Sequence, residues 1–240
     1  MNIDIKTVAI TGTTGGLGSL LANELASKGI NLIFIDRNFR KSKKLAEDIL
    51  KKYQNIEINF VTADLEDLDS VKDAVNELKK INFEILILNA GVYNVPIYKT
   101  NTGFNNVFQI NFASQYILAK KILNQNKSLK KIVAVSSIAH NLSRININDI
   151  DFSNNKSQMK IYGNSKRFLM FSLYELLKNN KDIKLSIVHP GVTLTSMTSH
   201  YNKSINWLVK LGVKLFFHHP KKQFNAYQVP FLTTVNILNG

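Results

Sequence analysis

A glycine-rich segment near the amino terminus constrains the fold of this chain more than any other feature. Its residues are Thr11-Gly12-Thr13-Thr14-Gly15-Gly16-Leu17-Gly18; they follow a predicted strand, Val8–Thr11, and open a helix predicted at about Leu17–Lys28. Glycines let the backbone turn tightly and approach a pyrophosphate, whose charge the amides and dipole at a helix start stabilise. The strand, loop and helix predict a dinucleotide site, and the alternative is a turn that only needs positive φ.

The rest of the chain alternates apolar runs with helical stretches. Further strands are expected at Asn31–Ile35, Ile56–Thr62, Glu84–Leu88, Lys131–Ser136 and Lys184–Val188. Helices are expected at Lys41–Tyr53, around Leu68 to Leu78, at Thr102–Leu123 and at Tyr162–Lys178, and irregular insertions at Asn94–Asn101, Ser143–Ile161 and Leu194–Lys222. This alternation predicts an α/β protein with a Rossmann-type, doubly wound parallel sheet, in which residues 1–240 form a single domain. Ligands of such a sheet bind outside the carboxyl ends of its strands.

Composition excludes several classes of function. Hydrophobic residues make up 45% of the chain and charged residues 20%, as in a packed globular protein. The chain has no cysteine, which excludes disulfides, thiolate metal sites and a cysteine nucleophile. The formal net charge of +14 comes mainly from lysines spread along the chain. We interpret this charge as a solvated surface and expect no nucleic-acid partner, because no motif for reading a groove or stacking on bases is present.

Localisation is predicted from what the sequence lacks. No segment reaches the roughly 18 uninterrupted apolar residues that a membrane span needs. The amino terminus carries an acid, Asp4, where a signal peptide would be basic, and it leads directly into the glycine loop. We therefore predict a cytoplasmic protein.

Two acidic residues at the ends of predicted strands point to the adenosine half of a dinucleotide. Asp36 ends the second strand, where a carboxylate can accept hydrogen bonds from both ribose hydroxyls. The alternative for Asp36 is a cap of the next helix. Asp64 ends the third strand and either meets the adenine edge or caps the helix that starts near Asp67.

A tyrosine and a lysine, Tyr162 and Lys166, are four residues apart in a helical segment, which puts both side chains on one face. A free phenol has a pKa of about 10 and is a poor base at neutral pH. A nearby ammonium favours the phenolate, and a phenol tuned in this way can exchange a proton with an alcohol or carbonyl oxygen. Alone, such a pair is more typical of an ordinary helix surface, so its weight comes from the surrounding motifs.

Taken together, the motifs resemble those of the short-chain dehydrogenase/reductase family over nearly the whole chain. The shared features are Thr11-Gly12-x-x-x-Gly16-x-Gly18, Asp64-Leu65, Asn89-Ala90-Gly91, Asn111, Ser136-Ser137, Tyr162-x-x-x-Lys166 and Pro190-Gly191-x-x-x-Thr195. The resemblance implies an enzyme that moves a hydride between a nicotinamide cofactor and a carbonyl or alcohol carbon of a small molecule. The alternative is a non-catalytic dinucleotide sensor on the same fold.

The resemblance also implies a role for each matching residue. Tyr162 would be the general acid/base, Lys166 would lower its pKa and bind the nicotinamide ribose, and Ser137 would orient the reacting oxygen. Asn111 would hold a water linked to Lys166, or would only perturb its helix, while Thr195 would contact the nicotinamide carboxamide. The other cofactor-binding residues would be Gly12, Thr14, Gly16, Leu17, Gly18, Asp36, Arg37, Asp64, Leu65, Asn89, Ala90, Gly91 and Pro190.

The chain departs from the family's commonest pattern in two places. Ser137 and Tyr162 are 25 residues apart, a long separation that resembles the retinol-dehydrogenase branch and implies an apolar carbonyl or alcohol substrate. The chain stops at Gly240, soon after a segment, Ala226–Thr234, that is similar to the last helix of that branch. We therefore expect a short or missing final strand, which leaves a homo-oligomer contact along that edge in doubt.

A segment before this last helix has two interpretations. The resemblance makes residues 194–222 a substrate lid, which we favour. The alternative is contact with a membrane interface, since Ile205–Phe217 is apolar and is flanked by lysines. No metal is expected at His218 and His219, because no carboxylate or third histidine is evident nearby.

The choice between NAD and NADP depends on two adjacent residues. The carboxylate of Asp36 suits the ribose hydroxyls of NAD and would repel the 2′-phosphate of NADP, whereas Arg37 suits that phosphate. Because Asp36 occupies the position that the ribose hydroxyls meet first, the sequence predicts a preference for NAD, with NADP as the second choice.

Overall fold

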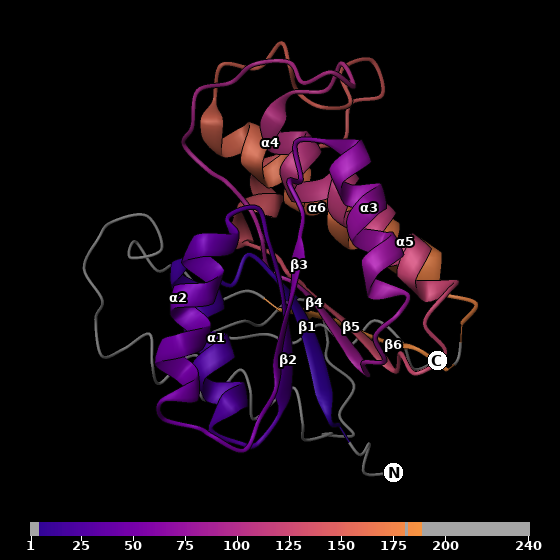
Figure 1. The fold of residues 1–240 in the computed structure, drawn as a ribbon. Helices are drawn as coiled ribbons and strands as arrows, with labels where there is room; N and C mark the ends of the chain where they lie inside the picture. Colours follow the sequence, from indigo (N-terminus) through magenta and orange to yellow (C-terminus); the bar gives the residue numbers. More distant parts are fainter. Residues whose placement is uncertain (1–4, 181, 189–240) are drawn as a thin grey trace.

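Six parallel strands form the centre of the molecule (Figure 1). The structure, a computed structural model, describes residues 5–180 and 182–188. In chain order the strands are β1 (Thr7–Thr11), β2 (Asn31–Asp36), β3 (Ile58–Thr62), β4 (Ile85–Leu88), β5 (Lys131–Val135) and β6 (Lys184–Val188). They lie in the order β3-β2-β1-β4-β5-β6, so the chain winds outward from β1 in one direction and then, from β4, in the other. The predicted doubly wound parallel sheet is thereby confirmed.

The strands are apolar along most of their length because both faces of the sheet are covered. In β1, Val8 and Ile10 face one side while Ala9 faces the other, and all three are completely buried. Ile10 pairs with Phe34 of β2 and with Ile87 of β4, which places the centre of the sheet at the strand that leads into the glycine loop.

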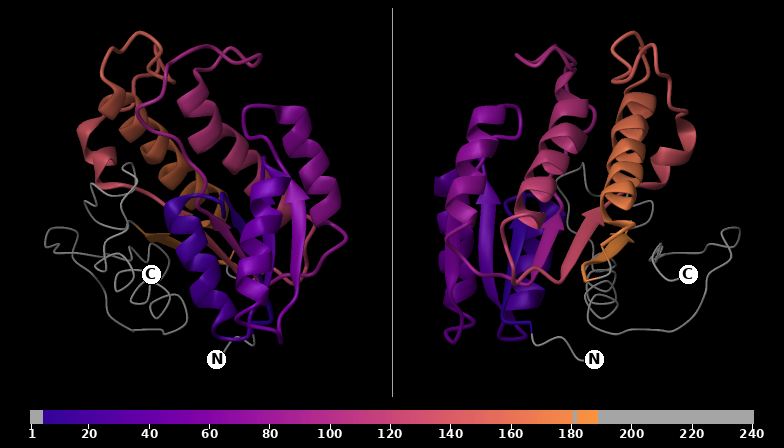
Figure 2. Two further views of the ribbon diagram at one scale, coloured as in Figure 1. Left: turned by 60° about the vertical axis from the view of Figure 1, so that its left-hand side comes forward. Right: turned by 90° about the vertical axis from the view of Figure 1, so that its right-hand side faces the viewer.

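Helices cover both faces of the sheet (Figures 1 and 2). On one face lie α1 (Gly16–Ala26) and α2 (Phe39–Leu50), which share an apolar core with β1 and β2. The other face carries α3 (Leu68–Leu78), α5 (Ser114–Leu123) and α6 (Gln158–Leu177). The two layers leave the carboxyl ends of the strands as the edge at which the predicted motifs meet.

The helix predicted at Thr102–Leu123 is interrupted. A short α4 (Asn106–Phe108) leads into a π-helical segment, η1 (Gln109–Ala113), before α5 begins. Asn105 fixes the start, since its side chain accepts a hydrogen bond from the Phe108 backbone N–H at 2.8 Å. Single π-helical turns frequently occur at functional sites, and this one contains Asn111.

The insertion between β5 and α6 is only partly irregular. It opens with a 3₁₀ helix, η2 (Ile138–Leu142), and projects at the top of Figure 1 together with the loop that follows β4. Asp151 joins the two segments, because its carboxylate accepts a hydrogen bond from the Asn105 backbone N–H at 2.6 Å. The prediction that Ser143–Ile161 is irregular is wrong at its end, because α6 already begins at Gln158 and its N-cap is Ser157.

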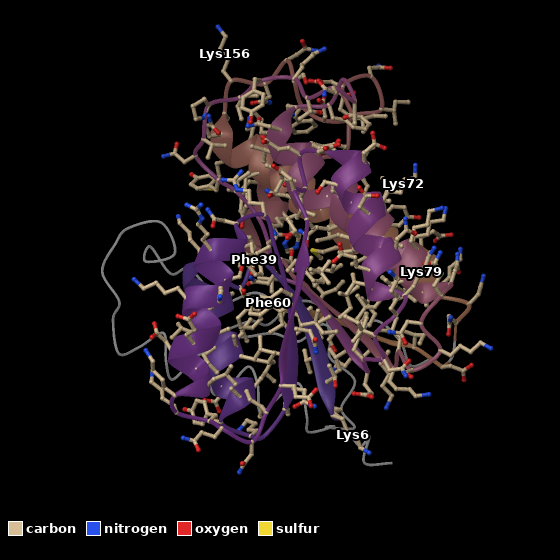
Figure 3. The ribbon with its side chains drawn as sticks, in the orientation of Figure 1. Lys6, Phe39, Phe60, Lys72, Lys79 and Lys156 are labelled. Atoms are coloured by element: carbon tan, nitrogen blue, oxygen red, sulfur yellow. The ribbon has the colours of Figure 1, made fainter. Side chains whose placement is uncertain are left out.

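The surface carries the positive charge. Lys72 and Lys79 extend from α3, and Lys156 extends from the insertion, all three exposed (Figure 3). Across the sheet edge the rings of Phe39 in α2 and Phe60 in β3 meet edge to face, with centroids 5.4 Å apart (Figure 3). The side chains of β3 and α2 therefore close this edge of the sheet.

Several predictions fall outside the described residues. These are the lid at 194–222, the segment Ala226–Thr234, the shortened final strand, and the roles of Pro190 and Thr195. Within the described part of the chain, no helix is both long enough and apolar enough to cross a bilayer.

Candidate functional site

The glycine loop has a backbone that only glycine fits at two positions. Gly12 has φ +71°, and a Cβ placed there would lie 2.8 Å from the Ala90 Cα. A Cβ on Gly18 would lie 2.1 Å from the Gly12 carbonyl oxygen. By contrast, a Cβ on Gly16 would meet no heavy atom within 4 Å. Gly12 and Gly18 therefore make the turn, while Gly16 leaves the start of α1 open.

The start of α1 has the character of an anion site. Its N-cap is Gly15, which supplies no side-chain cap, and its first turn contains no acidic residue. Thr14, Gly15 and Gly16 are exposed. Backbone N–H groups at such a helix start point outward and the helix dipole favours negative charge.

A network of buried hydrogen bonds fixes the loop onto the neighbouring strand. The Asn89 side-chain amide donates to the carbonyls of Thr11 and Gly12, at 2.9 and 3.0 Å. The Thr11 hydroxyl accepts from the backbone N–H groups of Asn89 and Ala90 and donates toward the Gln115 side chain at 3.1 Å. Asn89-Ala90 thus supports the loop, as the family resemblance implies.

Asp36 does not lie open at the end of β2. Its side chain is buried, and one carboxylate oxygen accepts hydrogen bonds from the hydroxyls of Thr13 and Ser42, the latter at 2.8 Å. The other oxygen accepts a long hydrogen bond, 3.4 Å, from the Thr14 backbone N–H. The carboxylate is therefore bound to the glycine loop and to α2. The alternative interpretation of Asp36 as a helix cap is wrong, because Asn38 caps α2.

The other residues predicted to surround the adenosine have mixed outcomes. Arg37 is exposed beside Asp36, and Leu65 is buried. Asp64 does not cap α3, whose cap is Asp67; its carboxylate instead accepts from the Glu66 backbone N–H at 3.0 Å. Asp64 thereby shapes the turn after β3 and keeps one carboxylate oxygen without a hydrogen bond from the described residues.

Three residues of the predicted reactive group come together. Tyr162 and Lys166 lie on α6, and Ser137 follows β5 at the start of η2. The Ser137 side chain is close enough to the Tyr162 phenol to lower its pKa. The neighbouring Ser136 instead directs its hydroxyl at the sulfur of Met170, at 2.9 Å. Of the two serines, the structure therefore brings Ser137 to the tyrosine.

The pKa of Tyr162 differs from expectation. Burial raises it above the ordinary value of 10.0, and the Ser137 side chain lowers it only in part. The expected lowering by Lys166 is not found. The Lys166 ammonium donates to the Val135 carbonyl at 3.0 Å and lies 5.8 Å from the centre of the Tyr162 ring. Burial lowers the pKa of Lys166 to about 8, which weakens its charge at neutral to alkaline pH.

Asn111 and Gly91 lie beside the lysine. Asn111 is completely buried, and its side chain both accepts from the Val92 N–H (2.7 Å) and donates to the Val92 carbonyl (2.9 Å). A Cβ on Gly91 would lie 3.2 Å from both the Asn111 Oδ1 and the Lys166 Nζ. Asn111 therefore holds the loop after β4 close to Lys166, and the water contact stays a prediction.

Sequence reasoning missed several residues of the site. Thr13 and Ser42 hold Asp36, and Gln115 bonds Thr11 and the Ala90 carbonyl, at 2.7 Å for the latter. The ring of Tyr93 lies edge to face with that of Tyr162, with centroids 5.1 Å apart. None of these residues belongs to a motif with a fixed spacing. The one signal in the sequence was their position, just after a strand or one turn into a helix.

The geometry fits a dinucleotide. The loop provides a cradle that a Cβ at Gly12 or Gly18 would fill, and the start of α1 has no side-chain cap. The reactive group lies at the adjoining strand ends, because Gly91 follows the strand that supports the loop and touches Lys166. Cofactor and reactive group can thus share one edge of the sheet.

Comparison with known proteins agrees with this arrangement. Residues 6–206 match the family model of the short chain dehydrogenases. Human polyprenol dehydrogenase is 29% identical over 222 residues, which are 88% of this chain and 66% of that protein. Human retinol dehydrogenase 13 is 30% identical over 202 residues, 81% of this chain and 61% of that protein. The chain thus spans less than two thirds of the length of these relatives.

A solved structure is similar in fold. The short-chain dehydrogenase from Sphingobium yanoikuyae in complex with NADPH superposes with a TM-score of 0.68 at 21% identity, over 88% of this chain and 84% of that one. Together with the family match over residues 6–206, the shared fold and motifs identify the chain. It belongs to the short-chain dehydrogenase/reductase family, in the branch similar to the retinol dehydrogenases.

Proposed function

We propose that the protein is a nicotinamide-dependent oxidoreductase that interconverts a carbonyl and an alcohol. The observation that carries this proposal is the meeting of Ser137, Tyr162 and Lys166 at the strand ends that also hold the glycine loop. When bound, the nicotinamide cofactor supplies or accepts the hydride. Gly12, Gly16, Gly18 and the exposed Thr14 would hold its phosphates.

Tyr162 supplies or takes the proton. With a pKa above 10, its phenol is protonated at neutral pH and can donate that proton to a carbonyl oxygen as the carbon is reduced. Ser137 orients the same oxygen through its hydroxyl. Lys166 places its ammonium on the Val135 carbonyl, 5.8 Å from the centre of the Tyr162 ring, and would bind the nicotinamide ribose. In alcohol oxidation the phenolate takes the proton, so that direction should be faster at alkaline pH.

The substrate is proposed to be an apolar carbonyl compound or alcohol. Tyr93 presents an aromatic ring against Tyr162, and an aromatic wall beside the proton donor suits an apolar molecule. Two relatives are named for retinol and polyprenol, both apolar alcohols. We also propose that residues 194–222 form a lid over this substrate and that 1–240 acts as a single domain in the cytoplasm, without a nucleic-acid partner or a metal.

For the cofactor, we propose NAD as the preferred form. The buried carboxylate of Asp36 lies at the end of β2, where it would oppose a 2′-phosphate. Like charges about 4 Å apart repel by about 4 kcal/mol at an effective dielectric constant of 20. NADP stays the second candidate, because Arg37 is exposed at the same strand end and can pair with a phosphate.

A panel of apolar aldehydes, ketones and alcohols, followed by the absorbance of reduced nicotinamide with each cofactor, tests the proposal. Turnover that disappears in Tyr162→Phe is the expected result. Tight binding of a dinucleotide without turnover of any substrate would favour the alternative, a non-catalytic sensor. The raised pKa of Tyr162 is the observation that favours the sensor, because a protonated phenol cannot act as a base.

Membrane contact and self-association require separate measurements. We propose a protein that stays in solution with anionic vesicles at physiological salt, where the charge of exposed lysines such as Lys72 and Lys79 is screened. Binding that survives high salt would contradict this. Sedimentation velocity determines whether the chain forms a homo-oligomer.

A further inference from the structure

The turn that carries Ser137 is clamped onto α6 at two points. At the first, Gly163 lies against the turn, and a Cβ there would be 2.1 Å from the Ala139 carbonyl oxygen. At the second, the Arg167 side chain donates from Nε to the His140 carbonyl oxygen at 2.9 Å. Gly163 and Arg167 both belong to α6, the helix that carries Tyr162.

His140 connects these two contact points to Ser137. The His140 backbone N–H donates to the Ser137 carbonyl at 3.1 Å, and the ring Nδ1 lies 2.5 Å from the same oxygen. A carbonyl oxygen only accepts, so Nδ1 carries a proton and donates it. Ser137 is further fixed by its hydroxyl, which accepts from the Ala139 N–H at 3.3 Å.

These contacts link Tyr162 to Ser137 through the protein. The path runs from Tyr162 along α6 to Arg167, across to the main chain of His140 and back to Ser137, whose side chain lowers the pKa of the Tyr162 phenol. Ser137 follows a strand while Tyr162 lies on a helix 25 residues later, so their separation depends on how the turn sits on the helix. A displacement of the turn would therefore change the distance between the two hydroxyls.

We propose that Arg167 and His140 are positioning residues for the reaction, which act by holding the Ser137 hydroxyl against the Tyr162 phenol. Neither residue touches the reacting atoms in this assignment, and Gly163 allows the close approach that they maintain. The predicted effect of the two residues on turnover rests on the proposed function. Their predicted effect on the titration of Tyr162 does not.

Removal of Arg167 should therefore act through Ser137. Arg167→Met keeps a long apolar side chain and loses the donor. We expect turnover to fall about tenfold, cofactor affinity to stay unchanged, and the pKa of Tyr162 to rise, as in Ser137→Ala, because the influence of Ser137 that lowers it is lost. In the Ser137→Ala background, Arg167→Met should cause no further change. Additive effects in the double variant, or an unchanged pKa in Arg167→Met, would overturn the proposal.

The titration is measured by NMR on protein labelled at the tyrosine Cζ, with the Tyr162 signal identified by its absence in Tyr162→Phe. Because this readout needs no substrate, it decides the proposal even if the proposed function fails in the substrate panel. Arg144→Met is the matched control. It removes one arginine charge from an exposed position in the insertion between β5 and α6, and it should change neither turnover nor the pKa of Tyr162.

His140 offers a second pair of variants should Arg167→Met unfold. An asparagine places its amide nitrogen where the imidazole has Nδ1, so His140→Asn should keep the pKa of Tyr162 and most of the turnover. His140→Leu lacks the donor and should raise that pKa as Ser137→Ala does. Equal effects of the Asn and Leu variants would overturn the role assigned to the ring.

Discussion

In the part of the chain before Gly91, the glycine loop would act through its backbone atoms, and close backbone contacts shape it. Gly12 and Gly18 can approach Ala90 and each other only because they lack a Cβ. In the part from Gly91 onward, the functional groups are side chains, and long-range contacts such as that between Lys166 and the Val135 carbonyl place them. We refer to these as the glycine-loop half and the tyrosine half.

The comparison shows why the two halves respond differently to change. An added atom at Gly12 or Gly18 has to displace main chain, which affects the fold and cofactor binding together. A changed side chain in the tyrosine half can leave the fold intact and alter only the proton transfer. Four predictions test this difference, and they are given from the largest expected effect to the smallest.

The largest effect is expected in the tyrosine half. Tyr162→Phe keeps the ring against Tyr93 and removes the hydroxyl, so turnover should fall by at least about a hundredfold, the usual scale of general acid–base catalysis. Titration calorimetry should show unchanged cofactor affinity. A parallel loss of cofactor binding would mean that the two halves are not separable in this way.

The glycine-loop half should show the opposite pattern. Gly18→Ala places a Cβ 2.1 Å from the Gly12 carbonyl, which is main chain, so we expect a loss of about 2–3 kcal/mol in unfolding free energy and no measurable cofactor binding. Gly16→Ala is the matched control, because its Cβ would meet nothing within 4 Å and should leave stability within about 0.5 kcal/mol of the parent. Chemical denaturation gives both values, and similar losses in the two variants would contradict the geometry.

Burial of Lys166 predicts a pH dependence of stability. Its pKa falls from 10.5 to about 8 on folding, so between these values the unfolded chain binds more protons and the unfolding free energy rises with pH. From pH 7.5 to 9.5 the wild type should gain about 2 kcal/mol relative to Lys166→Met.

The same shift occurs at Lys131, whose pKa burial also lowers to about 8, with Lys184 nearby. Lys131 is present in both proteins of the comparison, so its contribution cancels in the difference. Denaturant titrations at four pH values give that difference, and a flat line would show that Lys166 is solvated in the folded protein.

The smallest effect concerns cofactor choice in the glycine-loop half. Asp36→Ala removes the charge that opposes a 2′-phosphate, and the preference should move about tenfold toward NADP. Arg37→Ala should leave the use of NAD almost unchanged, because the side chain is exposed. The ratio of kcat/KM for the two cofactors measures both variants, and a wild type that already works better with NADPH would show that Arg37 dominates.

The elements that the sequence predicted well are those whose structure is determined by residues close together in the chain. The strand predicted at Lys184–Val188 matches the structure residue for residue, and its three central residues are buried. The glycine loop was recognisable because its sterics act over seven residues. The pairing of Tyr162 with Lys166 followed from helix periodicity alone.

The predictions that needed correction involve contacts between distant segments. The start of α4 at Asn106 depends on Asp151, which is 46 residues from Asn105. Asp36 has no neighbour in sequence that announces its burial, since Thr13 comes from the preceding loop and Ser42 from one turn into α2. Both cases depend on hydrogen bonds that form only after the helices and strands have packed together.

The sequence by itself determined the doubly wound sheet, the phosphate loop and the family, because periodicity and glycine sterics operate over a few residues. Only the tertiary structure decided that Arg167 reaches the turn that carries Ser137. It also decided that the pKa of Tyr162 is raised rather than lowered. The physical reason is that hydrogen bonding and desolvation depend on which atoms surround a group in space, and those atoms belong to segments far away in the chain.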